Sequence, residues 1–252
     1  MKIIKIGGSL ITDKDSYKTP DTHEINRIAR EISKGINSDR LILIHGAGSF
    51  GHPLVKKFKL NKKSTNKDLF SILKVQDSVR ELNRLFKDSL NKEKIPAYTI
   101  HPSSITRTEN GEIIDLELNT IRQALKEGYI PLLYGDMVLD TKNRASVLSG
   151  DRLVSFLAQE LKPNKVGMAT TTPVLDKNNQ KIDLITQTDL ENIGESNSTD
   201  VTGGMLNKVN ELLKTRAKSY IFNAKKRKAL EKFIKGKNIG TEVEYDDKGK
   251  KT

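Results

Sequence analysis

At the centre of the predicted fold is Leu41-Ile42-Leu43-Ile44-His45-Gly46-Ala47-Gly48-Ser49-Phe50-Gly51-His52. Its first four residues form a short apolar run that predicts a buried strand. Three glycines follow within six residues, and they let the backbone approach a ligand and turn its N–H groups toward it. Such a turn suits an anion, phosphate above all. We therefore expect an anion-binding loop between His45 and His52.

Two more glycine pairs lie where a predicted strand ends or a predicted helix begins. Residues 1–6 read as a strand that runs into Gly7-Gly8-Ser9, and Lys5 interrupts its apolar pattern. Gly203-Gly204 opens a helix, and Lys208 lies one turn inside it. Free N–H groups at such points bind anions. Together the three glycine turns predict a site for several phosphates, as phosphoryl transfer from a nucleotide to an anionic acceptor requires.

Strands and helices alternate along the chain, which predicts an α/β fold with a mainly parallel sheet. Between these elements, residues 101–111 read as a polar turn region and residues 173–187 as a hairpin with its turn at 177–179. Helix 21–36 has an apolar face, and Asp21 or Thr22 could cap it. The predicted strands are 1–6, 41–44, 97–100, 130–134, 165–169, 219–222 and 241–245; the predicted helices are 21–36, 66–93, 119–127, 149–161, one opening at 204, and 225–235.

Composition narrows the functional classes. The 252 residues carry a net charge of +12, with 35% hydrophobic and 5% aromatic residues. Basic and acidic residues alternate along most helices, and no aromatic RNA-binding signature is present, so nucleic acid is a minor alternative. The absence of cysteine excludes disulfides and thiolate nucleophiles. No apolar run approaches the length that spans a bilayer, and we expect a cytoplasmic protein without a membrane partner.

Several candidate site residues also have a structural interpretation. His45 ends a strand and is expected to pack beneath the loop, whereas His52 lies beyond the strand, where ligand binding is the better interpretation. Asp136 follows a strand end, and Asp151 follows Ser149-Gly150 at a helix start. Both aspartates are candidates for the site, with turn or helix capping as the alternative.

Four motifs in this order resemble the amino acid kinase superfamily over nearly the whole chain. They are Lys5-Ile6-Gly7-Gly8-Ser9, Gly135-Asp136, Ser149-Gly150-Asp151 and Thr202-Gly203-Gly204-Met205-x-x-Lys208. His45-Gly46-x-Gly48-Ser49-Phe50-Gly51-His52, with Lys14 in the context Ile-Thr-Asp-Lys, is similar to the isopentenyl phosphate kinase branch. The resemblance implies one αβα sandwich domain over residues 1–252. An N-terminal lobe (about 1–162) would bind the acceptor, and a C-terminal lobe (about 163–252) would bind ATP with Mg²⁺.

The resemblance also assigns roles to residues. Lys5 would reach the transferring phosphoryl group, Asp151 would orient the lysines, His52 would bind the acceptor's phosphate, and helix 66–93 would wall a pocket for a five-carbon chain. No side chain is assigned as a metal ligand. The implied catalytic residues are Lys5, Lys14, His52, Asp151 and Lys208; the acceptor site is Gly46, Ala47, Gly48, Gly51, His52, Gly135, Asp136 and Gly150; the nucleotide site is Lys5, Gly7, Gly8, Ser9, Lys14, Gly203, Gly204 and Lys208.

Two positions depart from the pattern of the family. Ala47 stands where many members have a third glycine, which is tolerated if its φ is negative. Residues 169–175 (Ala-Thr-Thr-Thr-Pro-Val-Leu) replace a Thr-Asp-Val-Asp-Gly-Val segment and lack both acids.

The implied function is ATP-dependent phosphorylation of isopentenyl phosphate in isoprenoid biosynthesis, by a homodimer. The alternatives are a related kinase for another phosphate or phosphonate, such as fosfomycin, or a non-catalytic nucleotide-binding protein of the same fold.

Overall fold

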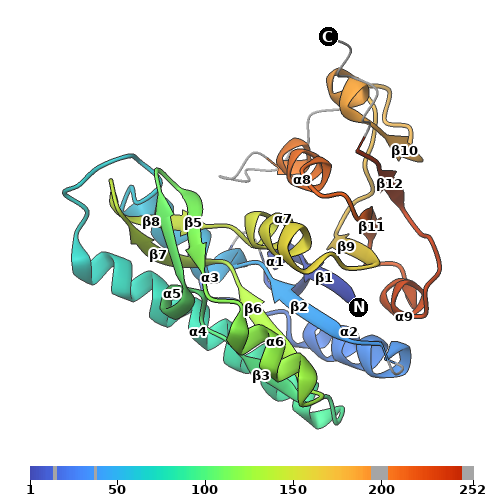
Figure 1. The fold of residues 1–252 in the computed structure, drawn as a ribbon, viewed down its shortest axis with the longest axis horizontal. Coiled ribbons are helices and arrows are strands. Elements are labelled where there is room, and N and C mark those ends of the chain that lie inside the picture. Colours follow the sequence, from blue (N-terminus) through green and yellow to red (C-terminus); the bar gives the residue numbers. More distant parts are fainter. Residues whose placement is uncertain (14–15, 37–38, 194–203, 246–252) are drawn as a thin grey trace.

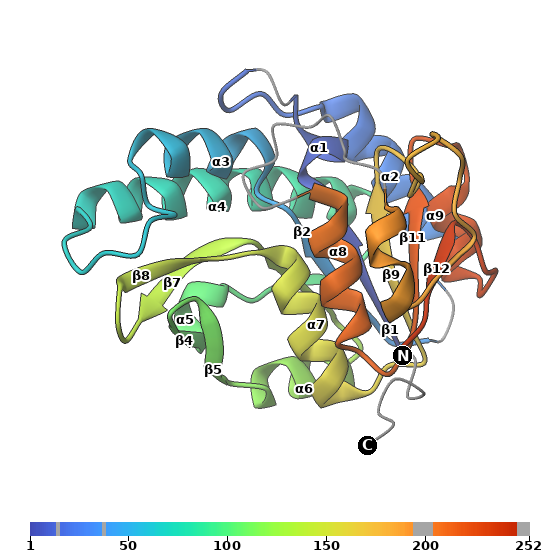
Figure 2. The same cartoon turned by 90° about the horizontal axis from the view of Figure 1, so that it is seen from above.

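A computed structural model describes residues 1–13, 16–36, 39–193 and 204–245. Its main feature is an eight-stranded sheet in the order β10-β12-β11-β9-β1-β2-β6-β3, with helices on both faces (Figures 1 and 2). Neighbouring strands are parallel except for the antiparallel pair β11–β12. The mainly parallel sheet confirms the prediction from the alternation of elements, and the helices on both faces make the αβα sandwich that the family resemblance implies. The strands are β1 (Lys2–Ile6), β2 (Leu41–His45), β3 (Ala97–Thr99), β6 (Ile130–Tyr134), β9 (Lys165–Thr170), β10 (Leu184–Ile185), β11 (Lys218–Asn223) and β12 (Thr241–Val243).

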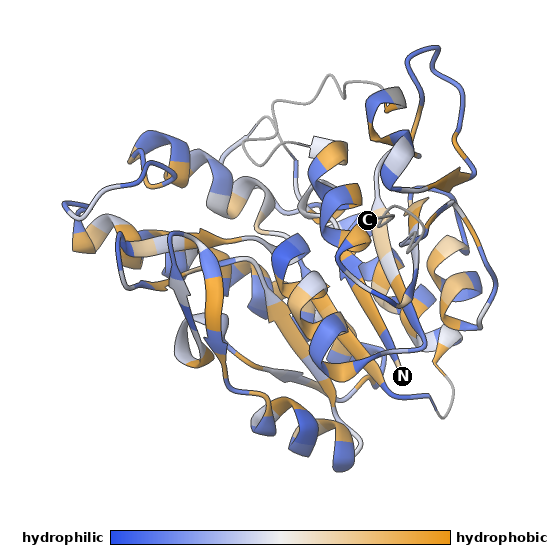
Figure 3. Cartoon of the chain, turned by 45° about the horizontal axis from the view of Figure 1, so that its top comes forward, coloured by the Kyte–Doolittle hydropathy of each residue, from blue (hydrophilic) through white to orange (hydrophobic). Residues whose placement is uncertain are grey.

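Helices from different parts of the chain cover each face. One buried cluster joins the sheet to α2 (Thr22–Gly35), α4 (Leu69–Lys92) and α9 (Ala229–Ile234). The other joins it to α6 (Asn119–Lys126), α7 (Gly150–Leu161) and α8 (Gly204–Leu213). Figure 3 shows the result, with hydrophobic strands in the centre and hydrophilic outer helix faces. The predicted lobe boundary near 162 falls between α7 and β9, which pairs directly with β1.

The alternation of side chains along β1 decides where Lys5 lies. Successive side chains of a strand point to opposite faces. Ile4 and Ile6 belong to the cluster under α2 and α4, whereas Ile3 belongs to the cluster under α7 and α8. Lys5 therefore shares the face of Ile3 and points toward α7, near the carboxyl end of the strand.

A second, four-stranded sheet in the order β5-β4-β7-β8 was not predicted. Residues 101–111 contain α5 (Pro102–Ile105) and β4 (Thr106–Glu109), so their assignment as a polar turn region was wrong. Residues Asn110 and Gly111 have φ values of 50° and 85° and close the β4–β5 hairpin, since Asn-Gly tolerates positive φ at both positions. The other strands are β5 (Glu112–Leu116), β7 (Asp136–Asp140) and β8 (Arg144–Leu148).

The glycine stretch after β2 is also more regular than expected. Only Gly46 and Ala47 form the turn, because α3 (Gly48–Lys57) begins at Gly48, so the prediction of a loop as far as His52 was wrong. Pro53 lies inside this helix and has no N–H to donate to the carbonyl of Ser49. That carbonyl accepts the Lys18 N–H instead, at 3.2 Å. The spacing Gly46-x-Gly48-x-x-Gly51 is typical of a turn between a strand and a helix, and it favours a helix that begins at Gly48.

The predicted hairpin over residues 173–187 is only partly formed. A single bridge joins Leu175 and Lys181 around a turn with Asn179 at φ 61°. Asp176 holds this turn, because its carboxylate accepts the N–H groups of Asn178 and Gln180 at 2.8 Å each. The segment then continues into β10 and the 3-10 helix η1 (Gln187–Asn192). Across the described ranges, no helix has the length and apolar character needed to cross a bilayer.

Candidate active site

A buried carboxylate with two lysines lies near the carboxyl end of β1. Lys5 Nζ lies 2.7 Å from Asp151 Oδ1, and Lys208 Nζ lies 3.7 Å from Asp151 Oδ2. Lys208 also donates to the carbonyl of Gly204 at 3.1 Å, across the first turn of α8. Lys5 is only 6% exposed and Asp151 5%. The structure thus brings together three residues that lie more than 50 positions apart in the sequence.

The start of α7 separates two roles that the sequence left open. Ser149 is the helix cap, because its side chain accepts the Arg152 N–H at 3.1 Å. Asp151 therefore does not cap the helix and turns toward the lysines. Gly150 lies against the sheet, and a Cβ atom at this position would be 3.4 Å from Lys5 Cε. A small residue at this position allows the close approach.

The two N-terminal glycine turns touch each other through their backbones. A Cβ on Gly46 would lie 2.6 Å from Gly8 N, and one on Gly8 would lie 2.7 Å from Gly48 Cα. Such distances are far shorter than a van der Waals contact, so only glycine fits. Gly48 also has φ 50°. The starts of α1 (Gly8–Ile11) and α3 therefore meet beside Lys5, and together they form a cradle for an anion.

Not every predicted N–H donor is available to a ligand. The Gly7 N–H donates to Ala169 O and the Gly46 N–H to Ile6 O, both at 2.9 Å. Gly135 N–H likewise donates to His45 O at 3.0 Å. This corrects the expectation that Gly7 and Gly46 offer N–H groups to phosphate: they continue the sheet's ladder. Gly8 and Gly48 begin helices, where the orientation of N–H groups suits an anion.

Thr12 connects the two glycine turns, and sequence analysis did not single it out. Its hydroxyl donates to Gly8 O at 2.9 Å and accepts the Ser49 N–H at 3.0 Å. The partner is 37 residues away, so no local pattern could have revealed it. Ser9, which was predicted to bind nucleotide, is half-buried in α1. Ala47 has a negative φ of −72°, so alanine is tolerated where many family members have glycine.

The two histidines of the glycine stretch differ in environment. His45 is fully buried and stacks on Tyr134 with ring centroids 5.4 Å apart. Its Nδ1 lies 3.0 Å from Gly46 O and its Nε2 lies 3.3 Å from Asn83 Oδ1; both oxygens accept, so the ring nitrogen that carries the proton is the donor. Burial lowers the pKa of His45 to about 4, so its ring is neutral at pH 7. His52 lies half-buried on α3, five residues into the helix. Asn83 was missed, although a polar residue on the apolar face of α4 is a detectable signal.

Asp136 begins β7 and has partners of its own. Its carboxylate accepts the Ser103 N–H at 3.2 Å and the Met137 N–H at 2.8 Å, and it is 3% exposed. Burial raises the pKa of this carboxyl. These contacts tie the short helix α5 to the strand, and the role of Asp136 in the acceptor site stays a prediction.

Gly204 and the segment 169–175 belong to the C-terminal part of the chain. Gly204 begins α8 with φ 59°. Lys14 and Gly203 lie outside the described residues. In the segment 169–175, the Thr170 hydroxyl contacts the carbonyls of Thr172 and Phe222 at 2.6 and 3.1 Å. Thr170 thus holds the ends of β9 and β11 together, where the family pattern has acids.

A buried apolar cluster lies next to α3 and beneath the second sheet. It joins α3, the first turns of α4, and the β7–β8 hairpin. Val79 of α4 is close to Gly51, where a Cβ would lie 3.2 Å from Val79 Cγ1. The wall predicted over residues 66–93 is therefore divided: Ile72 and Val75 face this cluster, and Leu82, Phe86 and Leu90 belong to the main core. The cluster is Leu54, Val55, Leu60, Ile72, Val75, Met137 and Ala145.

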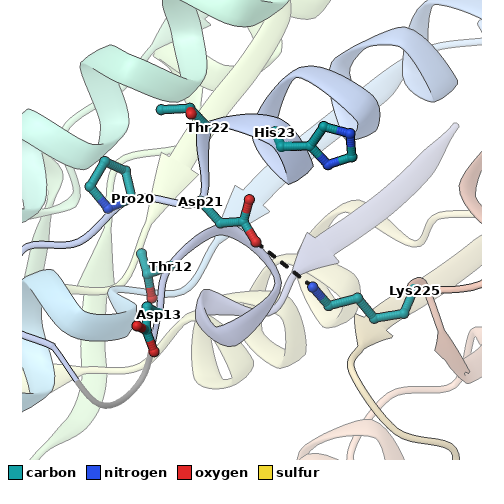
Figure 4. A pocket seen from close by; sticks show the side chains of 7 residues that line it. All are labelled: Thr12, Asp13, Pro20, Asp21, Thr22, His23 and Lys225. Carbon is teal, nitrogen blue, oxygen red and sulfur yellow. Dashed lines mark ion pairs between the residues drawn. The ribbon is translucent and has the colours of Figure 1, made fainter.

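An open hollow of about 560 Å³ lies at the start of α2 (Figure 4). Lys225 reaches across from the segment after β11 to within 3.9 Å of the Asp21 carboxylate. Asp21 in turn caps α2 by accepting the Glu24 N–H at 3.0 Å. None of the predicted site residues that the structure describes lines this hollow, so it carries none of the chemistry above. Its lining residues are Thr12, Asp13, Pro20, Asp21, Thr22, His23 and Lys225.

Comparisons with known proteins agree with this geometry. Residues 1–223 match the model of the amino acid kinase family. Isopentenyl phosphate kinase from Methanothermobacter thermautotrophicus is 36% identical over 96% of this chain and 98% of its own length. The enzyme of that name from Methanocaldococcus jannaschii is 32% identical over 98% and 100%. A crystal structure of an isopentenyl phosphate kinase superposes with a TM-score of 0.85, at 33% identity, over 96% of this chain and 99% of the other.

Proposed function

The chain belongs to the amino acid kinase family, and from this premise we propose that it transfers the γ-phosphoryl group of ATP to isopentenyl phosphate. The products are isopentenyl diphosphate and ADP, in isoprenoid biosynthesis. One observation carries the proposal: Asp151 lies between Lys5 and Lys208, at 2.7 and 3.7 Å, beside the glycine cradle of α1 and α3. The full-length similarity to isopentenyl phosphate kinases supports the choice of acceptor.

The chemistry requires alignment and charge neutralisation more than proton abstraction. The acceptor already carries an anionic phosphate oxygen, which attacks the γ-phosphorus of ATP as the bond to the β-phosphate oxygen breaks. Lys5 and Lys208 supply positive charge to the phosphates, and Asp151 keeps both ammonium groups in place while the site is empty of phosphate. The N–H groups at the starts of α1 and α3 add fixed dipoles.

A Cβ at Gly8 or Gly46 would collide with the backbone of the facing glycine turn, so the glycines let the two helix starts lie close enough to bind the phosphates of one nucleotide together. We propose Mg²⁺ as the companion ion of ATP, with Asp151 as the nearby buried carboxylate. Mg²⁺ commonly keeps several waters and is held through substrate phosphates with one or two carboxylates. When bound, the ion neutralises charge on the β- and γ-phosphates. Lys14 is proposed to contact the donor as well.

Acceptor recognition is proposed for the α3 side of the site. His52 would bind the phosphate of isopentenyl phosphate, and its hydrocarbon chain would lie against the apolar cluster that includes Ile72, Val75 and Met137. Burying a five-carbon chain favours an apolar wall. This arrangement distinguishes an alkyl phosphate from acceptors whose second half is polar.

We further propose that the protein works as a homodimer in the cytoplasm, where ATP and Mg²⁺ are available. The outer strand β3 offers an edge for a second copy. Tyr98 on this strand and Tyr129 are each 45% exposed, and their rings lie 5.5 Å apart. Sedimentation equilibrium is the test: a dimer is expected for the wild type and a monomer for Tyr98→Asp, and a wild-type monomer would contradict the proposal.

The experiment for the catalytic proposal is ADP release with ATP and Mg²⁺ on an acceptor panel. The panel contains isopentenyl phosphate, dimethylallyl phosphate, fosfomycin, N-acetylglutamate and UMP. The highest kcat/KM is expected for isopentenyl phosphate. A higher value for another acceptor would reassign the substrate within the same mechanism. No turnover on the panel by protein that still binds ATP would favour the non-catalytic alternative.

A further inference from the structure

The connection between α3 and α4 concentrates half of the chain's net charge. Residues 56–74, here named the basic hairpin, contain seven lysines and one aspartate, a net charge of +6 within a chain of +12. The hairpin projects at the end of the molecule away from α9 and β12 (Figures 1 and 2). Six of its lysines are exposed, so their charge faces solvent: Lys56, Lys57, Lys59, Lys62, Lys63 and Lys74.

The same segment exposes large apolar side chains. Leu69, Phe70 and Leu73 in the first turns of α4 are 56%, 72% and 49% exposed. Residues four apart share a helix face, so Leu69 lies beside Leu73 and Phe70 beside Lys74. The buried face of these turns is made by Ile72 and Val75. The start of α4 therefore has a second apolar face, which no described residue of the chain covers.

Charged and apolar groups form one continuous surface. Lys57 Nζ lies 5.7 Å and Lys74 Nζ 6.0 Å from the centre of the Phe58 ring, so Phe58 joins the end of α3 to the start of α4. Phe70 and Leu73 adjoin Lys74 on the helix. Exposed lysines and exposed aromatic and aliphatic side chains thus adjoin one another at the ends of α3 and α4. Such a combination is typical of peripheral membrane-binding surfaces.

Internal contacts hold the basic hairpin in this shape. The seventh lysine, Lys67, is buried and donates to Ala145 O on β8 at 2.5 Å. Arg144 donates to Lys67 O at 2.9 Å. Asp68 caps α4 by accepting the Ser71 N–H at 2.7 Å. The exposure of Leu69 and Phe70 is therefore imposed by the fold, because the cap and the strand contacts fix the first turn of α4.

We propose that the basic hairpin docks on the surface of an anionic lipid bilayer. The lysines would attract the lipid phosphates, and Leu69, Phe70 and Leu73 would enter the boundary between headgroups and acyl chains. A single-stranded nucleic acid would instead favour several aromatic platforms for base stacking, whereas two of these three side chains are aliphatic. Docking of this kind needs no spanning helix. The proposal therefore differs from the expectation of no membrane partner, which considered only spanning segments.

Vesicle co-sedimentation of the full chain tests the proposal without reference to kinase activity. The probes are phosphatidylcholine vesicles and vesicles in which a third of the lipid is phosphatidylglycerol. Binding is expected only to the anionic vesicles and should weaken as salt is added. Absence of binding to the anionic vesicles at low salt, by protein that is folded by circular dichroism, would overturn the proposal.

Matched variants separate this surface from general electrostatics. Lys62→Glu/Lys63→Glu should lower vesicle binding by roughly tenfold or more, because each lysine near an anionic surface is worth about fivefold. Lys226→Glu/Arg227→Glu makes the same charge change on exposed residues of the other lobe and should have less than half that effect on a logarithmic scale. Equal losses for the two double variants would contradict a localised docking surface.

The apolar contribution has its own pair of variants. Phe70→Ser should lower binding by about tenfold, as expected when a phenyl ring no longer leaves water. Leu184→Ser removes another exposed apolar side chain, 49% exposed on β10, and should leave binding unchanged. Loss of self-association in Phe70→Ser without any vesicle binding by the wild type would assign the surface to a second copy. RNA binding by the wild type without vesicle binding would assign the surface to nucleic acid. Either result rejects the lipid proposal.

Discussion

Two buried lysines on adjacent strands have opposite environments. Lys5 lies near the carboxyl end of β1, 2.7 Å from the Asp151 carboxylate. Lys165 begins the neighbouring strand β9, and its ammonium group donates to Gly236 O, Lys237 O and Asn238 Oδ1 at 3.1, 2.7 and 2.8 Å. Its Nζ also lies 4.6 Å from the ring centres of Tyr220 and Phe233.

The difference separates chemistry from stability. Carbonyl oxygens and aromatic faces satisfy Lys165 completely within the protein, and they fix the chain that follows α9. The Asp151 carboxylate balances the charge of Lys5 at the end of the sheet where the glycine turns lie, so an incoming phosphate can share the ammonium group. In parallel α/β sheets, ligands bind outside the carboxyl ends of the strands. The amino end, where Lys165 lies, serves the fold.

The largest effect is expected from Lys5→Met. Removing a charge that stabilises the transferring phosphoryl group should lower kcat by about a thousandfold. ATP-dependent turnover of isopentenyl phosphate measures it, with circular dichroism as the control for folding. A kcat within tenfold of wild type would place Lys5 outside the reacting centre and remove the contrast with Lys165.

His52→Gln tests acceptor binding at the carboxyl end of the sheet. The KM for isopentenyl phosphate should rise at least tenfold, because the ring would no longer bind the acceptor's phosphate, whereas the KM for ATP should stay within twofold. Steady-state kinetics with each substrate varied in turn give both constants. An equal rise in both KM values would indicate a general disturbance of α3 rather than acceptor binding.

His45 contrasts with His52 through its pH dependence. Its folded pKa of about 4 lies below the ordinary value near 6.5, so the unfolded chain binds more protons between these values. Stability is therefore present above pH 6.5 and falls as the pH decreases toward 4, by roughly 3 kcal/mol for this group. In urea titrations, His45→Gln should flatten this slope, whereas His23→Gln, which removes an exposed imidazole, should not. Parallel profiles for wild type and His45→Gln would contradict the assignment.

Lys165→Met should affect stability and spare catalysis. Three oxygen acceptors would lose their donor, at a cost of roughly 1–3 kcal/mol, or a fall in Tm of about 2–4 °C for each kcal/mol. Differential scanning calorimetry measures the fall, and kcat at a temperature where both proteins are folded should agree within twofold. A kcat loss as large as that of Lys5→Met would show that catalysis and stability are not separated between the two ends of the sheet.

Ser149→Ala is expected to have the smallest effect. Loss of the cap on α7 should cost about 1 kcal/mol of stability, measured by urea unfolding. Its neighbour in the motif, Asp151→Asn, should instead lower kcat more than tenfold, because Lys5 and Lys208 would lose the carboxylate that positions them. The reverse pattern would exchange the roles of the two side chains.

Local patterns predicted the elements of the main sheet well. The apolar runs at 41–44 and 130–134 became β2 and β6, and the apolar periodicity from Asp21 onward became α2 with Asp21 as its cap. These strands and helices pack together in one sandwich, so the apolar residues that form a pattern in the sequence are the ones that are buried. The second sheet was missed because its strands form no continuous apolar run: β4 and β5 are half exposed, and β7 and β8 mix polar with apolar residues, although Asn110-Gly111 signalled a hairpin.

The residues of the site could be predicted from the sequence, but the hydrogen bonds among them could not. Lys5, Asp151 and Lys208 were singled out by motif, and their convergence needed the register of β1 against α7. The N–H groups of Gly7 and Gly46 were assigned to phosphate but belong to the ladder, since a strand's last donors depend on partners distant in sequence. Thr12 and Asn83 were missed for the same reason: their partners lie 37 and 38 residues away.

One measurement tests the central claim most directly: ³¹P NMR of the protein with ATP, Mg²⁺ and isopentenyl phosphate. The account predicts that the monophosphate resonance is replaced by the two coupled resonances of a diphosphate monoester, in equal amount to the ADP formed. Lys5→Met, folded and at the same concentration, should leave the monophosphate essentially unchanged over the same time. An unchanged monophosphate with wild-type protein that binds ATP, or ADP formed with inorganic phosphate alone, would contradict the account.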